Sequence, residues 1–415
     1  MYALLIAAAA MALATGPDPA PGPHDVLNTD GLQYRIQPSV VIEDFDGKGC
    51  WFHARGGIIP SDDPNAAPTV LITMQKWYVN VSDYFSGLSF IKSDDMGKTW
   101  SDPVTPDTLA WRSEANDTTV GVCDFTPGWH PQTKTLFGMG HTVRYQNGKL
   151  MKDPRPRETA YSVYDANTNQ WSDWDIIKMP DMPIFFNSGN GCGQWLVEDN
   201  GDLLVPIYFK PASTDYYAVL STTVMRCSFD GKTVRYKEHG NILTTEKPRG
   251  AYEPSLTRHK GKFYLTMRND DRAYVSVSDD GLNYAPITPW LFDDGKEIGS
   301  YNTQAHWVSH SDALFLVYTR KDPATNHIPR NRAPLYMSQV DTEKMCLIRS
   351  TEQIVVPERG AMLGNFGVVT VSPNETWVTV GEGMYKPEEA MKHGAKGRVW
   401  ASRIVWSRPN KLRLP

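Results

Sequence analysis

Alternating hydrophobic and polar positions divide most of this chain into pairs of short strands separated by turns. Residues 189–209 (GNGCGQWLVEDNGDLLVPIYF) illustrate the pattern. They predict a glycine-rich entry, a strand over 194–198, a turn at Asn200-Gly201 and a second strand over 203–209. An Asn-Gly pair between two apolar runs is typical of a hairpin turn.

The same hairpin recurs along the chain at a spacing of about 45–70 residues, which is typical of a repeat architecture. The predicted hairpins cover residues 50–75, 121–145, 193–209, 253–270, 304–320 and 364–383. A third alternating strand follows each hairpin, over residues 88–95, 160–166, 222–230, 273–281, 334–341 and 399–406. One such unit cannot bury both faces of its sheet, so the units are expected to stack around an axis.

The predicted fold is therefore all-β, a single β-propeller of six or seven blades. Six units are counted in the sequence, and residues 32–44 (LQYRIQPSVVIED) are left over. We expect this segment to close the ring as the outer strand of the last blade.

Turns after the third strands carry a more specific signal. Residues 93–100 (SDDMGKTW) match the Asp-box pattern S-x-D-x-G-x-T-W, and 276–284 and 227–236 are weaker versions. In such a turn the aspartate accepts backbone N–H groups and the glycine takes a positive φ. The motif is structural and favours a sialidase-like propeller, but it predicts no activity.

Composition narrows the class of protein. The net charge of −5 argues against nucleic-acid binding, and beyond the N-terminus no apolar run has the length of a membrane helix. Residues 1–25 resemble a secretory signal peptide followed by a Pro-rich spacer, which leaves 26–415 as one propeller domain. The predicted protein is secreted or periplasmic, a monomer, and has a carbohydrate rather than a nucleic acid or a membrane as its partner.

Five cysteines are widely spaced and form no C-x-x-C pair. This spacing argues against a zinc ribbon and against a disulfide-dense scaffold. We expect the cysteines to pack in the core.

Propeller geometry indicates where the chemistry should lie, because one face gathers the starts of the innermost strands and the loops after the second strands. Nearly every predicted blade has polar residues there, and polar groups near a central channel need partners. A water-filled channel with structural hydrogen bonds is the simpler interpretation. The candidates are His53, Arg55, Asp124, His141, Gln194, Tyr208, Glu253, Arg268, Gln304, His306, Arg320, Asn365 and Glu382.

Arginines on two neighbouring predicted blades indicate the chemical class of the ligand. The set consists of Arg268, Arg272, Arg320, Arg330 and Arg332. Planar guanidinium groups suit a carboxylate or a sulfate, although surface arginines often serve solubility alone.

The segment 327–368, together with GCWFHARGG (49–57) and SDDMGKTW, resembles a family of secreted sialidase-like propellers. Its members are L-rhamnose-α-1,4-D-glucuronate lyases, earlier described as α-L-rhamnosidases, which remove terminal rhamnose from arabinogalactan proteins and gum arabic. The resemblance covers nearly the whole mature chain. Two departures stand out: the family often has histidine at the position of Asn331, and it is described as seven-bladed.

The implied reaction is β-elimination from a 4-linked glucuronate. It requires a cation at the C6 carboxylate, a base for the C5 proton and an acid for the leaving O4. Under this hypothesis an arginine among 268, 272, 330 and 332 holds the carboxylate. His53, ranked first, or His141 acts as base or acid with Tyr208 in support, and the remaining candidates bind substrate.

Three alternatives remain open at this stage. An exo-sialidase requires arginines from three blades, a Tyr/Glu nucleophile pair and an acidic residue, and Arg35 in YRIQP and Tyr252-Glu253 only partly match. A glycoside hydrolase would use paired carboxylates among Asp124, Glu253 and Glu382. A non-catalytic carbohydrate-binding propeller would use the same fold without catalysis.

No cofactor is expected to be required. A cation on the axis held by His141, His306 and Gln304 is conceivable, but the spacing of these residues is not diagnostic. A structural calcium ion held by backbone carbonyls would leave no trace in the sequence.

Overall fold

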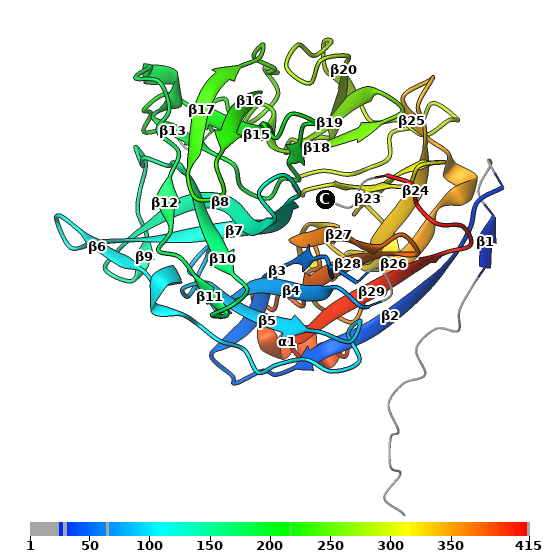
Figure 1. Ribbon diagram of the computed structural model, residues 1–415, viewed down its shortest axis with the longest axis horizontal. Coiled ribbons are helices and arrows are strands. Elements are labelled where there is room, and N and C mark those ends of the chain that lie inside the picture. Colours follow the sequence, from blue (N-terminus) through cyan, green and yellow to red (C-terminus); the bar gives the residue numbers. More distant parts are fainter. Residues whose placement is uncertain (1–24, 28–30, 64–65, 216, 413–415) are drawn as a thin grey trace, which may run out of the picture.

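The computed structural model describes residues 25–27, 31–63, 66–215 and 217–412. Its strands form six sheets arranged around a central axis, which confirms the predicted β-propeller (Figure 1). Within the described residues, no helix combines the length and the apolar character that a membrane crossing requires. The predicted signal segment lies outside the described residues except for Asp25.

Each sheet corresponds to one predicted unit, and its innermost strand comes from the start of that unit. The first sheet contains β3 (Gly49–Ile59), β4 (Thr69–Tyr78) and β5 (Ser89–Ser93). The second contains β6 (Arg112–Glu114), β7 (Thr118–His130), β8 (Thr135–Gln146), β9 (Lys149–Leu150), β10 (Thr159–Asp165), β11 (Gln170–Trp171) and β12 (Asp175–Ile176). The third contains β13 (Asn187–Gly189), β14 (Leu196–Val197), β15 (Leu203–Lys210), β16 (Ser221–Phe229) and β17 (Val234–His239).

The other three sheets complete the ring. The fourth contains β18 (Tyr252–His259), β19 (Lys262–Arg268), β20 (Tyr274–Ser278) and β21 (Thr288–Pro289). The fifth contains β22 (His306–Ser309), β23 (Leu314–Tyr318), β24 (Leu335–Asp341), β25 (Cys346–Leu347) and β26 (Gln353–Val356). The last contains β27 (Phe366–Ser372), β28 (Glu375–Gly381), β29 (Arg398–Trp406), β2 (Gln33–Glu43) and β1 (Asp25–Leu27). Helical segments in the described chain are short: η1 (Asp107–Leu109), η2 (Pro183–Phe185), η3 (Pro323–Thr325), η4 (Pro329–Asn331), η5 (Arg349–Thr351) and α1 (Pro387–Lys392).

The leftover N-terminal segment closes the ring as the sequence predicts. Strand β2 pairs antiparallel with β29, from Tyr34 opposite Trp406 to Glu43 opposite Arg398. The first part of the described chain thus completes the last sheet (Figure 1).

The hairpin at 189–209 departs from the prediction at its inner strand. The second strand forms over Leu203–Lys210, but the first is broken into β13 and β14, and Gln194 lies between them. The predicted turn is present: Gly201 has φ +88° and its N–H donates to the carbonyl of Glu198. Glycines at 189, 191 and 193 account for the break, because a glycine-rich run is a poor strand former.

The Asp-box turns form as the motif predicts. Oδ1 of Asp95 accepts the Thr99 N–H at 3.0 Å, and Gly97 has φ +76°. The Trp100 ring lies 6.3 Å from that of Trp377 in the neighbouring last sheet. The motif therefore joins two blades.

Hydrophobic clusters lie between neighbouring blades, where one sheet packs on the next. Leu71 of β4 packs with Phe125 and Leu136 of the next sheet, and Tyr264 of β19 packs with Trp307 of the next. All five cysteines are buried free thiols, as core packing predicts. Because each cluster joins two sheets, the ring is stabilised as one unit.

Candidate functional site

A cavity of about 530 Å³ opens at the N-terminal ends of the innermost strands, and strands or adjoining loops of all six units line it. Seven cationic side chains and four carboxylates line it: Arg155, Arg157, Lys210, Arg249, Arg268, Arg330 and Arg332, and Asp83, Asp124, Asp153 and Glu253. The cavity is therefore net positive in a chain whose net charge is −5. This charge distribution favours an anionic ligand.

Four successive blades aim a side chain at this cavity through an unusual backbone conformation. His53, Asp124, Cys192 and Glu253 have φ of 53°, 53°, 72° and 46°. The strand register shifts at three of these positions, as at a β-bulge: next to His53, Asp124 and Glu253. Non-glycine residues at positive φ are strained, and such strain and bulges are frequent at functional sites.

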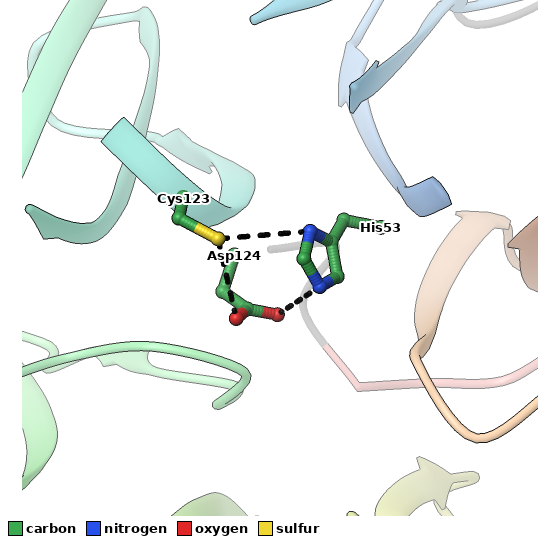
Figure 2. A group of neighbouring side chains, drawn as sticks. All are labelled: His53, Cys123 and Asp124. Atoms are coloured by element: carbon green, nitrogen blue, oxygen red, sulfur yellow. Dashed lines mark hydrogen bonds and ion pairs between the residues drawn. The ribbon is translucent and has the colours of Figure 1, made fainter. Parts of the chain in front are cut away.

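Asp124 lines the cavity and contacts both His53 and Cys123 (Figure 2). Nη2 of Arg55 donates to its Oδ1 at 2.8 Å, and Nε2 of His53 lies 3.2 Å from the same oxygen. Burial alone would raise the pKa of Asp124, but His53 and Arg55 lower it well below its usual range. Asp124 is therefore a buried, ionised carboxylate.

His53 uses both ring nitrogens within this cluster. Nδ1 lies 3.7 Å from Sγ of Cys123, and Nε2 faces Asp124 (Figure 2). Nε2 also lies 2.8 Å from the amide nitrogen of Asn365. Burial lowers the pKa of His53, although Asp124 opposes the shift. The ring is thus neutral and oriented by its neighbours.

The same three residues are the group in the described chain whose ligand atoms lie close enough for a metal ion. The residues do not fit this role well. His53 presents different nitrogens to Cys123 and Asp124, and one ion can contact only one of them. Arg55 already occupies Asp124, and burial holds the pKa of the Cys123 thiol well above its usual value, whereas metal ligation needs the thiolate.

His141 lies on β8, directly opposite Cys123 of β7, and borders the cavity. Its Nδ1 is buried without a hydrogen-bond partner, and a Cβ added to Gly191 would lie only 1.8 Å from that atom. Burial, followed by the charge of Arg157, lowers the pKa of His141 to about 3. The imidazole is therefore neutral at physiological pH, and Nε2 is the nitrogen left to meet a ligand.

Tyr208 lies beside His141, with ring centroids 6.3 Å apart. Nη1 of Arg157 donates to the Tyr208 hydroxyl at 2.6 Å, and the guanidinium lies over the phenol ring at 4.0 Å from its centroid. Burial raises the pKa of Tyr208 well above its usual value despite Arg157. The phenol keeps its proton, and that proton is free to be donated because Arg157 uses the oxygen as an acceptor.

Glu253 and Arg268 form a buried pair on the neighbouring blade. Nη1 of Arg268 donates to both carboxylate oxygens of Glu253 at 2.6 Å, and Nη2 donates to Oδ1 of Asn302. Burial would lower the pKa of Arg268, but Glu253 and Tyr252 raise it above its usual value. Glu253 is therefore committed to an ion pair.

Arg330 and Arg332 complete this side of the cavity and differ from Arg268 in their partners. Nη2 of Arg332 donates to the carbonyl of Asn302 at 2.6 Å, and its Nε is buried with no hydrogen-bond partner. Burial, Arg268 and Arg330 together lower the pKa of Arg332 to about 9. Arg330 is exposed at the rim with φ +60°. A buried guanidinium beside other cations is the environment that an incoming anion would stabilise most.

Most of the residues predicted from the sequence line this cavity. They are His53, Asp124, His141, Tyr208, Glu253, Arg268, Gln304, Arg330, Arg332 and Asn365.

Three of the predicted residues lie beneath the cavity, in a hydrogen-bonded network on the axis. Nη2 of Arg55 also donates to Gln304, whose Oε1 lies 3.0 Å from Nε2 of His306. Nδ1 of His306 lies 3.0 Å from the Ser255 hydroxyl, which donates to Gln194. Arg55, Gln194 and His306 therefore support the site from below and do not line it.

Two predicted arginines and one carboxylate lie elsewhere, which corrects their assignment to the cavity. Arg272 pairs with Asp271 and Glu297 near the surface, and Arg320 pairs with Glu352 and Asp322. Glu382 accepts the backbone N–H of Lys396 and Arg398 and does not line the cavity.

Sequence reasoning missed Arg155, Arg157 and Arg249, which all line the cavity. They lie in loops between strands, and the sequence search considered Arg330 and Arg332 in one such loop but not these three. The signal was present: residues 153–158 (DPRPRE) follow the second strand of their unit, and such loops open onto the same face.

No family model and no curated protein matches this chain. Solved sialidase structures are similar to it. Trypanosoma rangeli sialidase in complex with the inhibitor DANA matches with a TM-score of 0.53 at 12% identity, over 93% of this chain and 60% of its own. The Hadza microbial sialidase Hz136 matches with a TM-score of 0.57 at 12% identity, over 88% and 68%.

The NanB sialidase of Streptococcus pneumoniae matches with a TM-score of 0.54 at 11% identity, over 91% of this chain and 71% of its own. This chain spans less than two thirds of the T. rangeli sialidase chain, at 60%. At these identities the similarity shows the fold, which is that of a sialidase-like β-propeller.

Proposed function

We propose that this protein is a secreted glycan lyase that removes terminal L-rhamnose from α-1,4-linked D-glucuronate by β-elimination. One observation carries the proposal: a single cavity combines a buried arginine without a carboxylate partner, a neutral histidine and a protonated tyrosine. These are the three groups that elimination from a uronate requires.

Arg332, assisted by Arg330, would bind the C6 carboxylate. The buried Nε of Arg332 offers an unused donor, and neither arginine forms an ion pair within the described residues. Neutralising the carboxylate acidifies the C5 proton, because the carbanionic charge that develops at C5 can delocalise into it. Arg268 contributes positive charge nearby but remains paired with Glu253.

His141 is assigned as the base and Tyr208 as the acid. Nε2 of His141 takes the C5 proton, the C5–H electron pair forms the C4=C5 double bond, and the C4–O4 bond breaks. The Tyr208 hydroxyl gives its proton to O4 of the departing rhamnose, and Arg157 stabilises the phenolate left behind. Water returns a proton to Tyr208 and removes one from His141, so the cycle consumes no co-reactant.

This assignment differs from the ranking made on sequence, which placed His53 first. Both nitrogens of His53 already face partners, whereas His141 has an unengaged ring at the cavity. His53 is therefore proposed to position Asn365 and Asp124.

The leaving sugar also has a suitable place in the cavity. Phe52, Trp77, Phe85, Met362 and Tyr385 form an apolar wall beside His53. The Trp77 and Tyr385 rings stack with centroids 5.8 Å apart. A 6-deoxy sugar such as rhamnose presents a methyl group and an apolar ring face, which such a wall can bury.

Two alternative activities find less support in the described residues. A sialidase would use Arg35, but this residue lies on β2, opposite Val405 of β29, in the outer part of its sheet. A hydrolase would use a pair of free carboxylates, but Asp124 and Glu253 are held by Arg55 and Arg268, and Glu382 lies outside the cavity.

The test is incubation with gum arabic, in which free rhamnose and the ultraviolet absorbance of the C4=C5 double bond are measured together. Wild type should release rhamnose with rising absorbance. His141→Ala and Tyr208→Phe should each lower the rate by about 10²–10⁴-fold, the usual contribution of an acid or base. Arg272→Gln serves as the matched control, because Arg272 lies outside the cavity.

Each other result contradicts the proposal in a defined way. Rhamnose without absorbance would mean hydrolysis. Release of sialic acid from a sialylated glycan, with neither signal on gum arabic, would support the sialidase. Binding without any product would support a non-catalytic carbohydrate-binding propeller.

A further inference from the structure

Six of the seven cations that line the cavity form two groups, and the proposed reaction uses only one group directly for the uronate. The seventh, Arg249, lies 3.6 Å from the carboxylate of Asp270. One group consists of Arg268, Arg330 and Arg332. The other consists of Arg155 and Arg157 on the loop before β10, with Lys210 beside them.

A pair of tyrosines separates the two groups. The Arg157 guanidinium lies over the Tyr208 ring at 4.0 Å, and the Tyr208 and Tyr252 ring centroids are 6.2 Å apart. The Arg268 guanidinium lies 4.8 Å from the Tyr252 centroid. The two cationic groups therefore flank a tyrosine floor, which suits a sugar ring between them.

Arg155 and Arg157 make hydrogen bonds to neutral acceptors only, within the described residues. Nη1 of Arg155 donates to the carbonyl of Met151 at 2.6 Å, and Nη1 of Arg157 donates to the Tyr208 hydroxyl. Nε of Arg157 is buried with no partner. The nearby carboxylate of Asp153 is already paired with Lys210 at 3.0 Å.

Two adjacent cations in a partly buried place repel each other, and burial adds to the cost of their charges. Burial and the charge of Arg157 lower the pKa of Arg155. An oxyanion between the two guanidinium groups would relieve this repulsion and supply charge-assisted hydrogen bonds.

We propose that Arg155 and Arg157 form a second anion subsite, which takes an additional acidic group on a sugar next to the reacting uronate. The inference rests on the proposed function, because it places that uronate at Arg332. The acidic group is an oxyanion, either the carboxylate of a second uronate or a sulfate ester. The preferred substrate is therefore a glycan with two acidic groups.

The test compares kcat/KM on three substrates: a rhamnosyl-glucuronate disaccharide, and trisaccharides in which the next sugar has a carboxylate or a sulfate. Wild type should prefer at least one trisaccharide by about tenfold or more, a typical gain for charge-assisted binding. Arg155→Gln should remove this preference, mainly through KM, and change kcat/KM on the disaccharide by less than about twofold. Arg155→Lys should retain part of it, because the charge remains without the planar fork.

Two results would overturn the subsite. One is equal kcat/KM of wild type on all three substrates, and the other is an equal loss in Arg155→Gln on every substrate. The two trisaccharides distinguish a carboxylate from a sulfate as the second group. A matched thermal unfolding curve for Arg155→Gln excludes misfolding as the cause of a loss.

Failure of the proposed function gives a different result, because no substrate would then yield an unsaturated product. The subsite is tested separately by calorimetric titration of wild type and Arg155→Gln with inorganic sulfate at constant ionic strength. Sulfate binding that is several-fold weaker in the variant supports the subsite, and identical binding overturns it.

Discussion

The two ends of the propeller axis are built from the same inner strands but differ in almost every property. At the N-terminal ends lies the cationic cavity, with side chains at positive φ and bulges in the strand register. At the C-terminal ends lies a second cavity of about 590 Å³, bordered by Trp129, Trp195 and Trp307. We call the second end the regular end, because the register shifts next to His53, Asp124 and Glu253 lie at the first.

The C-terminal segment after β29 adds to the regular end. Nδ2 of Asn410 donates to the carbonyl of Ser309, and its Oδ1 accepts the N–H of Ser311. The backbone N–H of Asn410 donates to the carbonyl of Pro373. Asn410 therefore connects the β22–β23 turn to the β27–β28 turn, across the joint between the last two sheets.

Glycine-to-alanine substitutions at the two ends give the sharpest comparison. An added Cβ at Gly191 would lie 1.8 Å from Nδ1 of His141, and one at Gly128 would lie 2.5 Å from the Trp195 ring. Both variants should lose stability by about 1–3 kcal/mol through overpacking. Only Gly191→Ala should also lower kcat/KM, by about 10²-fold, because it displaces the proposed base. Equal kcat/KM of the two folded variants would remove His141 from the reaction.

Stability should fall with acid because histidines near the first end are buried and neutral. Burial lowers the pKa of His53, of His306 and of His141, the last to about 3, whereas the unfolded value is about 6.5. Below that pH the unfolded chain binds more protons than the folded one, so the free energy of unfolding falls as pH decreases toward the folded pKa values. For His141 the slope should approach about 1.4 kcal/mol per pH unit between its unfolded and folded pKa values.

Urea unfolding at several pH values between 7 and 4 measures this slope. His141→Gln should reduce the slope by the equivalent of one proton, since it removes one group that must stay neutral. A slope that is unchanged in this variant would mean that His141 titrates alike in the folded and unfolded chain.

Much of the fold was predictable from the sequence, because the pattern that predicts each hairpin lies within the hairpin's own residues. Alternation and turn residues predicted every inner hairpin except the broken strand at 194–198, and the leftover 32–44 segment predicted the ring closure. The broken strand was missed because its glycines weaken pairing, which depends on the neighbouring sheet.

The site was less predictable, since it depends on which side chains the blades bring together. Arg268 and Arg272 are four residues apart, yet one pairs with Glu253 in the cavity and the other with Glu297 near the surface. The local sequence pattern cannot distinguish the two arginines, because the turn after β19 determines where each side chain points. Arg155 and Arg157 lie in a loop, where no periodicity indicates orientation.

Asn410→Ala tests whether the regular end contributes stability without contributing to catalysis. The side chain is 4% exposed and its amide makes hydrogen bonds to Ser309 and Ser311, so truncation should cost about 1–3 kcal/mol of unfolding free energy. Asn410→Asp keeps the acceptor for Ser311 but places a carboxylate oxygen against the carbonyl of Ser309, so it should also destabilise the protein. Chemical denaturation measures the loss, and kcat/KM of the folded enzyme should stay unchanged. A fall in kcat/KM at full folding would show that the two ends are coupled.

Arg272→Gln should have the smallest effect and marks the edge of the site. Arg272 pairs with Asp271 at 3.0 Å and with Glu297, and its side chain is 32% exposed. Partly exposed ion pairs of this kind contribute at most about 1 kcal/mol. Both kcat/KM on gum arabic and the urea midpoint should therefore match wild type closely, whereas Arg332→Gln, which removes the proposed carboxylate ligand, should raise KM and lower kcat. A tenfold loss in Arg272→Gln would extend the substrate contact beyond the cavity and would place the uronate nearer the surface than Arg332.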